Sequence, residues 1–78
     1  MPTIPIPGPY EFGFFSNEGS EPAHVHAVRE GKKCKFWLDP VRLADGGRFA
    51  GHELNKIKKL VTKHEHEIQA KWDEHFPG

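Results

Sequence analysis

Two histidines separated by one residue, His24 and His26, are the side chains of this sequence best suited to chemistry. They follow Pro22 in the stretch PAHVHAVR, which has the composition of a β-strand. Alternate side chains of a strand point to the same face, so this spacing presents two imidazoles side by side. Such a pair could bind a metal, transfer protons near neutral pH, or simply be two polar residues on the wet face of a sheet.

Acid–base catalysis is the most specific of these alternatives. Two imidazoles can serve as base and acid in the cleavage of a phosphodiester bond without a metal. Lys35 and Trp37, which we expect beside them, could hold a phosphate and stack on a base, as in a metal-independent ribonuclease. The candidate catalytic residues are thus His24 and His26, and the candidate binding residues are Lys33, Lys35, Trp37 and Arg29.

A metal site would need further ligands from elsewhere in the chain. Zinc takes three or four ligands, and the remaining histidines are at positions 52, 64, 66 and 75. Most of them fall in a segment with helical spacing that we expect behind the sheet, and Cys34 should lie on the face opposite the histidine pair. We therefore expect no metal and no cofactor, and keep a metal-binding domain only as a third alternative.

A sheet and a helix must position these residues. The segments YEFGFFS, AHVHAVR and KKCKFWLD have the composition of strands, and VRLADGG can form a short fourth one. From His52 to His75, apolar residues recur at steps of three and four, which predicts an amphipathic helix. We predict one α+β domain over residues 1–78: a Pro-rich segment at 1–9, an antiparallel sheet of three to four strands at 10–48, and one long helix at 52–75 packed on one face.

A two-residue loop at Glu30 and Gly31 would fix the register of the central hairpin. It would pair Val25 with Phe36 and His24 with Trp37, and would sort the side chains into two faces. One face is Val25, Ala27, Cys34, Phe36 and Leu38, and the other is His24, His26, Val28, Lys33, Lys35 and Trp37. We predict that the helix buries Leu54, Ile57, Val61, Ile68 and Trp72 against the apolar face. The two histidines should then be accessible to solvent.

Composition limits the compartment and the partners. The 78 residues have a formal net charge of zero, but residues 29–48 hold six basic and three acidic side chains. This local excess could meet a phosphate backbone or an acidic protein. The lone Cys34 fits a reducing compartment. We find neither a signal peptide nor an apolar run that could span a bilayer, so we expect a cytoplasmic protein without a membrane partner.

The order of the motifs resembles a known family. MPTI, FFSNE, PAHVHA and KFWLDPVRLA follow one another, ahead of an amphipathic helix that ends in Trp, Glu and Phe. This order is similar to that of the small bacterial family catalogued as domain of unknown function 4160. His24 and His26 match its His-x-His element, and Asn17 and Glu18 match its polar loop. The family brings no established catalytic residues.

The resemblance implies a short cytosolic bacterial protein that forms one half of a two-gene unit. Its neighbour would be a small protein of the family catalogued as domain of unknown function 2442, and some members are labelled as the toxin of a toxin–antitoxin pair. The leading hypothesis is a toxin-like protein that acts on RNA through the histidine face. The alternative is a non-catalytic interaction module that binds the product of the neighbouring gene.

Overall fold

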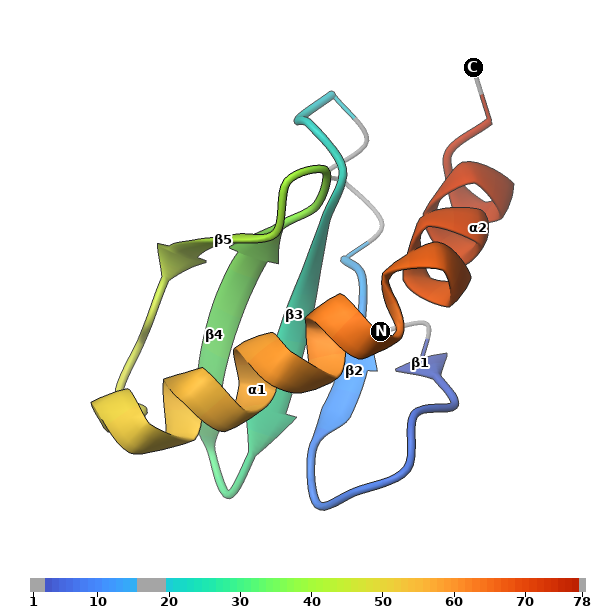
Figure 1. Ribbon diagram of the computed structural model, residues 1–78. Coiled ribbons are helices and arrows are strands. Elements are labelled where there is room, and N and C mark those ends of the chain that lie inside the picture. Colours follow the sequence, from blue (N-terminus) through green and yellow to red (C-terminus); the bar gives the residue numbers. More distant parts are fainter. Residues whose placement is uncertain (1–2, 16–19, 78) are drawn as a thin grey trace.

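The computed structural model describes residues 3–15 and 20–77 as a five-stranded antiparallel sheet and two helices (Figure 1). The strands lie side by side in chain order. They are β1 (Thr3–Ile4), β2 (Glu11–Gly13), β3 (His24–Arg29), β4 (Lys32–Trp37) and β5 (Arg42–Asp45). The helices are α1 (Gly51–Lys63) and α2 (Glu65–His75). The predicted α+β class is confirmed, but there are more strands than the predicted three to four and two helices in place of one.

The additional strand comes from the Pro-rich N-terminal segment. Thr3 pairs with Gly13 and Ile4 with Phe12, which makes β1 an edge strand beside β2. An edge strand tolerates neighbouring prolines because its outer side needs no ladder hydrogen bonds. Ile4 and Ile6 are buried in the core, so their apolar burial holds this segment on the sheet.

The register of the central hairpin agrees with the prediction at every pair. His24 lies opposite Trp37 and Val25 opposite Phe36, through to Arg29 opposite Lys32. The loop is the expected two-residue turn, with φ of 51° at Glu30 and 77° at Gly31. Positive φ at both positions is typical of a type I′ turn, whose twist matches that of the strands. The turn and the apolar alternation therefore select the same register.

The apolar face of the hairpin is covered by α1, as predicted. Figure 1 shows α1 crossing the strands of the sheet. Ile57 and Val61 are fully buried in one cluster with Val25, Cys34 and Phe36. Leu54 and Leu60 pack at the margin of this cluster and are only partly buried. Burial of this size contributes roughly 1.5–3 kcal/mol for each large apolar side chain.

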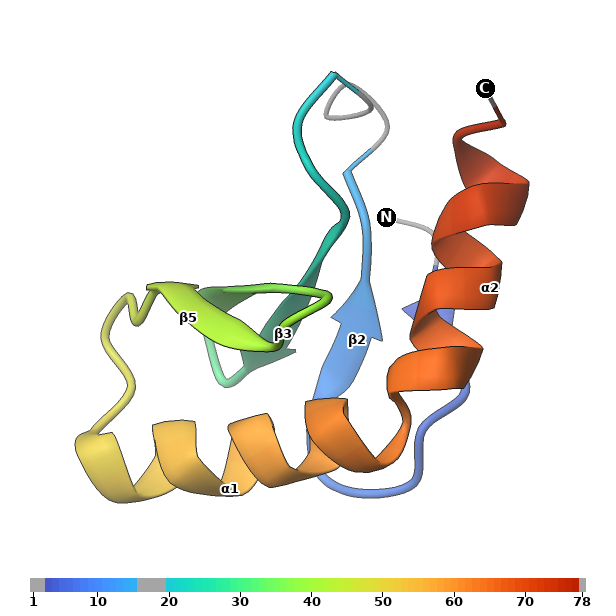
Figure 2. The same cartoon turned by 45° about the horizontal axis from the view of Figure 1, so that its top comes forward.

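The predicted long helix is broken at His64. His64 has φ −105° and ψ 19°, and α2 leaves the direction of α1 at this residue (Figure 2). A straight helix over 52–75 would be about 36 Å long, whereas five strands at about 4.8 Å spacing span only some 20–25 Å. The bend returns Ile68 and Trp72 to the core, where both are buried.

The outer edge strand, β5, contains an irregularity. Asp45 lies opposite Lys35 and Leu43 opposite Phe36, so Ala44 is an extra residue in the ladder. Such a bulge puts Asp45 in place of Ala44 opposite Lys35, on the same face as Arg42 and Trp37. Bulges also protect an exposed strand edge against pairing with another chain.

Candidate functional site

The two histidines are buried, contrary to our prediction. The exposed fraction is 0% for His24 and 4% for His26. The predicted register and the predicted apolar face are both right, so the error lies in what covers the second face. The structure therefore places the candidate catalytic pair beneath a layer of aromatic side chains.

The aromatic cover comes from three directions. The Trp72 ring of α2 lies 4.8 Å from the His24 ring, and the Trp37 ring of β4 lies 5.7 Å from it. The Phe15 ring lies 4.6 Å from that of His26. Pairing of β2 with β3 ends at Gly13 and His26, so β2 does not flank His24. The bent α2 therefore packs against His24 at this end of β3.

The buried imidazoles have defined contacts. The rings of His24 and His26 are 5.2 Å apart and nearly perpendicular, at 87°. Nδ1 of His24 is 2.9 Å from the carbonyl oxygen of Pro22. A carbonyl only accepts hydrogen bonds, so this contact requires that Nδ1 carries the proton. The contact fixes the ring orientation, which suits a packing role for His24.

The accessible part of this side of the sheet is formed by stacked pairs of lysine and aromatic residues. Nζ of Lys33 lies 4.8 Å from the ring centre of Phe15, and Nζ of Lys35 lies 4.5 Å from that of Trp37. Lys35 also forms an ion pair with Glu21. We call Phe15, Lys33, Lys35 and Trp37 the outer face.

A hollow of about 220 Å³ is lined by His26, Lys33, Cys34, Lys35 and Asp45. Two lysines and one aspartate are thus among the residues around a hollow with the volume of about seven water molecules or one large side chain. The outer face brings together three of the four predicted binding residues, Lys33, Lys35 and Trp37.

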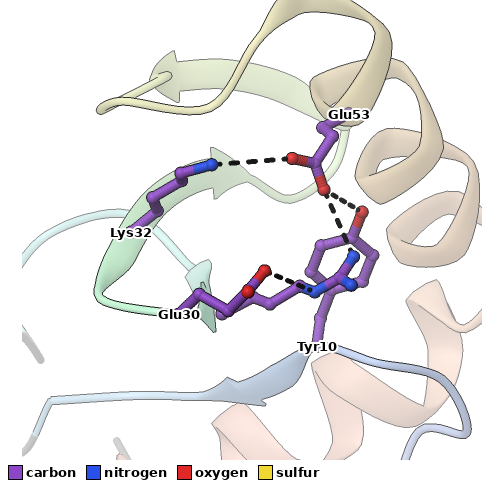
Figure 3. A network of polar contacts seen from close by, with 5 residues as sticks. Tyr10, Glu30, Lys32 and Glu53 are labelled. Carbon is purple, nitrogen blue, oxygen red and sulfur yellow. Dashed lines mark hydrogen bonds and ion pairs between the residues drawn. The ribbon is translucent and has the colours of Figure 1, made fainter.

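Arg29, the fourth predicted binding residue, belongs to a different cluster at the end of the hairpin, in which Figure 3 labels Tyr10, Glu30, Lys32 and Glu53. The hydroxyl of Tyr10 donates a hydrogen bond of 2.8 Å to Oε2 of Glu53, in the first turn of α1. Arg29 lies 3.5 Å from the same oxygen, and Nζ of Lys32 lies 4.0 Å from Oε1. The cluster fastens the hairpin to α1, and Arg29 is engaged within it.

The electrostatics of this cluster follow from its contacts. Burial, with the hydrogen bond to Glu53 as a second cause, raises the pKa of Tyr10 above its ordinary 10.0. The hydrogen bond from Tyr10, aided by the charges of Lys32 and Arg29, holds the pKa of the Glu53 carboxyl below its ordinary 4.5. The folded state therefore favours a neutral phenol beside an ionised carboxylate.

Tyr10→Phe should lower the melting temperature by a few degrees, roughly 4–8 °C for each kcal/mol lost. The ionised Glu53 carboxylate stabilises the folded state at pH values above its unfolded pKa near 4.5. This stabilisation is lost as the pH falls through the lower pKa of the folded state. Tyr10 contributes stability below pH 10.0, and this is lost as pH rises through the raised folded pKa. The difference between wild type and variant should be greatest from about pH 5 to 9 and shrink at both extremes, as measured by thermal melts across pH. A pH-independent difference would contradict the assigned hydrogen bond.

Cys34 lies on the core face, as predicted, and is buried. Burial raises the pKa of its thiol to about 11. The thiolate is the nucleophile in cysteine chemistry, so this residue is an inert packing group at neutral pH.

Within residues 3–15 and 20–77, no three side chains of the metal-binding types lie close enough together to hold an ion. No helix in that part of the chain is long and apolar enough to cross a membrane.

A family model for a domain of unknown function, DUF4160, matches residues 10–73, which is most of the chain. The chain belongs to the DUF4160 family. The resemblance seen in the sequence motifs is confirmed, and the matched region includes the whole outer face and the buried histidine pair. No curated protein and no solved structure matches the chain.

Membership in the DUF4160 family assigns no activity, so the site must be judged from its geometry. Asn17 and Glu18, which match the polar loop of the family, lie outside the described residues. The roles of two residues that shape this region were not predicted from the sequence. Phe15 was one aromatic residue among several in its strand-like segment, and Glu53 carried only the signal of an acidic side chain in a first helical turn.

Proposed function

We propose that this protein is a non-catalytic interaction module of a two-protein bacterial unit and that its outer face binds a small partner protein. The observation that carries the proposal is the layering of this side of the sheet. Both imidazoles are buried, while Lys33, Lys35 and Trp37 remain at least partly exposed above them. The partner would be the product of the neighbouring gene, as the family resemblance implies.

Acid–base cleavage of RNA by the histidine pair fits this geometry poorly. A general base must approach to about 2.6–3.2 Å of the proton that it removes. His24 is enclosed by Trp72 and Trp37, so a phosphodiester cannot reach it in this conformation. A toxin-like role would then arise from binding a target, with no bond cleaved.

The outer face has the chemistry of a protein-binding surface. Tryptophan and other aromatic residues dominate the energetics of protein interfaces, and Trp37 stands beside the hollow lined by Lys33 and Lys35. The two lysine side chains are already held over aromatic rings, which reduces the entropy lost on binding. The matching partner surface is an apolar side chain flanked by carboxylates.

Trp37→Ala should weaken binding to the neighbouring gene's product by about 2 kcal/mol or more, roughly 30-fold in Kd. Isothermal titration calorimetry with the two purified proteins measures this change. Lys33→Glu should weaken binding as well, because it reverses a charge at the rim of the hollow while leaving the core untouched.

Leu43→Ala is the matched control. Leu43 is 47% exposed but lies opposite Phe36, on the other face of the sheet. Its replacement should leave the Kd unchanged. Wild-type affinity in both Trp37→Ala and Lys33→Glu would contradict the proposal. RNA cleavage by the isolated protein that is lost in a folded His26→Gln variant would favour the catalytic hypothesis.

A further inference from the structure

The solvent-facing side of α1 carries a row of positive charges that the outer face does not include. Four exposed lysines form this lysine row, and they are Lys56, Lys58, Lys59 and Lys63. Three of them, at positions 56, 59 and 63, recur at steps of three and four on the side away from the buried Ile57, and Lys58 projects from the flank of the helix. At 1.5 Å per residue, the row extends about 10 Å along the helix.

No carboxylate of α1 neutralises the lysine row. Glu53 is the only acidic residue of α1, and its carboxylate is engaged by the Tyr10 hydroxyl at 2.8 Å and by Arg29 at 3.5 Å. Across residues 3–15 and 20–77, no ion pair within 4.0 Å involves any of the four lysines. Their charges therefore face solvent.

The bend at His64 separates the lysine row from the acidic C-terminal helix. The acidic residues of α2 are Glu65, Glu67, Asp73 and Glu74. On a straight helix Lys63 and Glu67 would be neighbours at a spacing of four residues. In the bent structure α2 points away from the line of α1 (Figure 2), and Glu67 contacts His64 at 3.4 Å. The bend thus keeps the acidic residues of α2 away from the line of the lysine row.

The end of the β3–β4 hairpin lies beside the first turn of α1 and carries paired charges, because Arg29 and Lys32 both lie within 4.0 Å of Glu53. Nζ of Lys32 lies 4.0 Å from Oε1 of Glu53, which places Lys32 beside the first turn of α1 (Figure 3). A row of lysines on a rigid helix is complementary to an array of negative charges at regular spacing. The row contains no aromatic side chain for stacking on unpaired bases, and the apolar side of α1 is committed to the core.

We propose that α1 binds the phosphate backbone of a double-stranded nucleic acid through the lysine row, without reading its sequence. Lysine acts as a point charge and contacts phosphates in any sequence context. An acidic protein fits less well, because an interface on this row would bury almost no apolar surface. This binding does not depend on the outer face or on its partner.

Fluorescence anisotropy with labelled 20-base-pair DNA and RNA duplexes of arbitrary sequence tests the proposal. Wild type should bind with a Kd in the micromolar range at low salt. Contact with about four phosphates predicts a loss of roughly 100-fold in affinity between 50 and 200 mM salt. Affinity independent of salt would overturn the proposal. Stronger competition by a single strand or by polyglutamate than by unlabelled duplex would also overturn the proposal.

Replacement of the four lysines by glutamine, K56Q/K58Q/K59Q/K63Q, should lower duplex affinity at least tenfold and flatten its salt dependence. Glutamine retains helix propensity, and circular dichroism confirms the fold. The corresponding arginine variant should keep wild-type affinity, as should Lys71→Gln in α2 and Trp37→Ala on the outer face. Duplex binding by the glutamine variant equal to that of wild type would overturn the proposal.

Discussion

His24→Ala is expected to lower the free energy of unfolding by about 2–4 kcal/mol, because it removes a fully buried ring and leaves a cavity. The cavity would open between Trp72 and Trp37, and the hydrogen bond to the Pro22 carbonyl would be lost. A domain of this size has only about 3–5 kcal/mol of net stability. Chemical denaturation should therefore show that most of the net stability of the domain is lost.

One further variant separates the effect of ring volume from that of the hydrogen bond, and a second serves as a control. His24→Phe restores the ring volume without the Nδ1 donor, so it should recover part of the lost stability. Lys33→Ala is the matched control, because it changes an exposed residue of the same face and should alter stability by no more than about 0.5 kcal/mol. An unchanged melting temperature in His24→Ala would contradict the burial of this side chain.

Trp72→Ala is expected to lower the free energy of unfolding by about 3–5 kcal/mol. The Trp72 ring lies 5.2 Å from Phe14, 4.3 Å from Phe76 and 4.8 Å from His24. Together with the fully buried Ile68, it holds α2 against the rest of the structure. An isolated helix of 11 residues is marginal in water, so α2 should unfold when this contact is lost.

Hydrogen exchange read by mass spectrometry distinguishes local from global loss in this variant. Amides of Glu65–His75 should lose protection first, while those of α1 should retain more of theirs for as long as its buried Ile57 and Val61 hold it on the sheet. Lys71→Ala, one residue away on the exposed side of α2, serves as the control and should exchange like wild type. Equal protection of α2 in Trp72→Ala and wild type would show that other contacts hold this helix.

The sequence by itself determined the central hairpin and the face on which α1 packs. The two-residue Glu30–Gly31 loop sets the register of the hairpin through local turn geometry. Strand side chains alternate with a period of two, so a shift of one residue would expose Val25 and Phe36. Helical spacing likewise placed Ile57 and Val61 on the buried side of α1. The motif order was sufficient to indicate the family that the family model then confirmed.

Only the tertiary structure decided the burial of His24 and His26. No glycine or proline marks the bend at His64, and the apolar spacing continues from Val61 to Ile68 without a change of phase. The bend arises because a straight helix would extend beyond the sheet. It brings Trp72 onto a face that strand alternation alone assigns to solvent.

The Tyr10–Glu53 hydrogen bond has the same origin. Its partners are 43 positions apart, and their sequence carries no local signal for the contact. Local rules fix which side chains share a face. What covers that face depends on the path of distant elements, and that path is settled by packing of the whole chain.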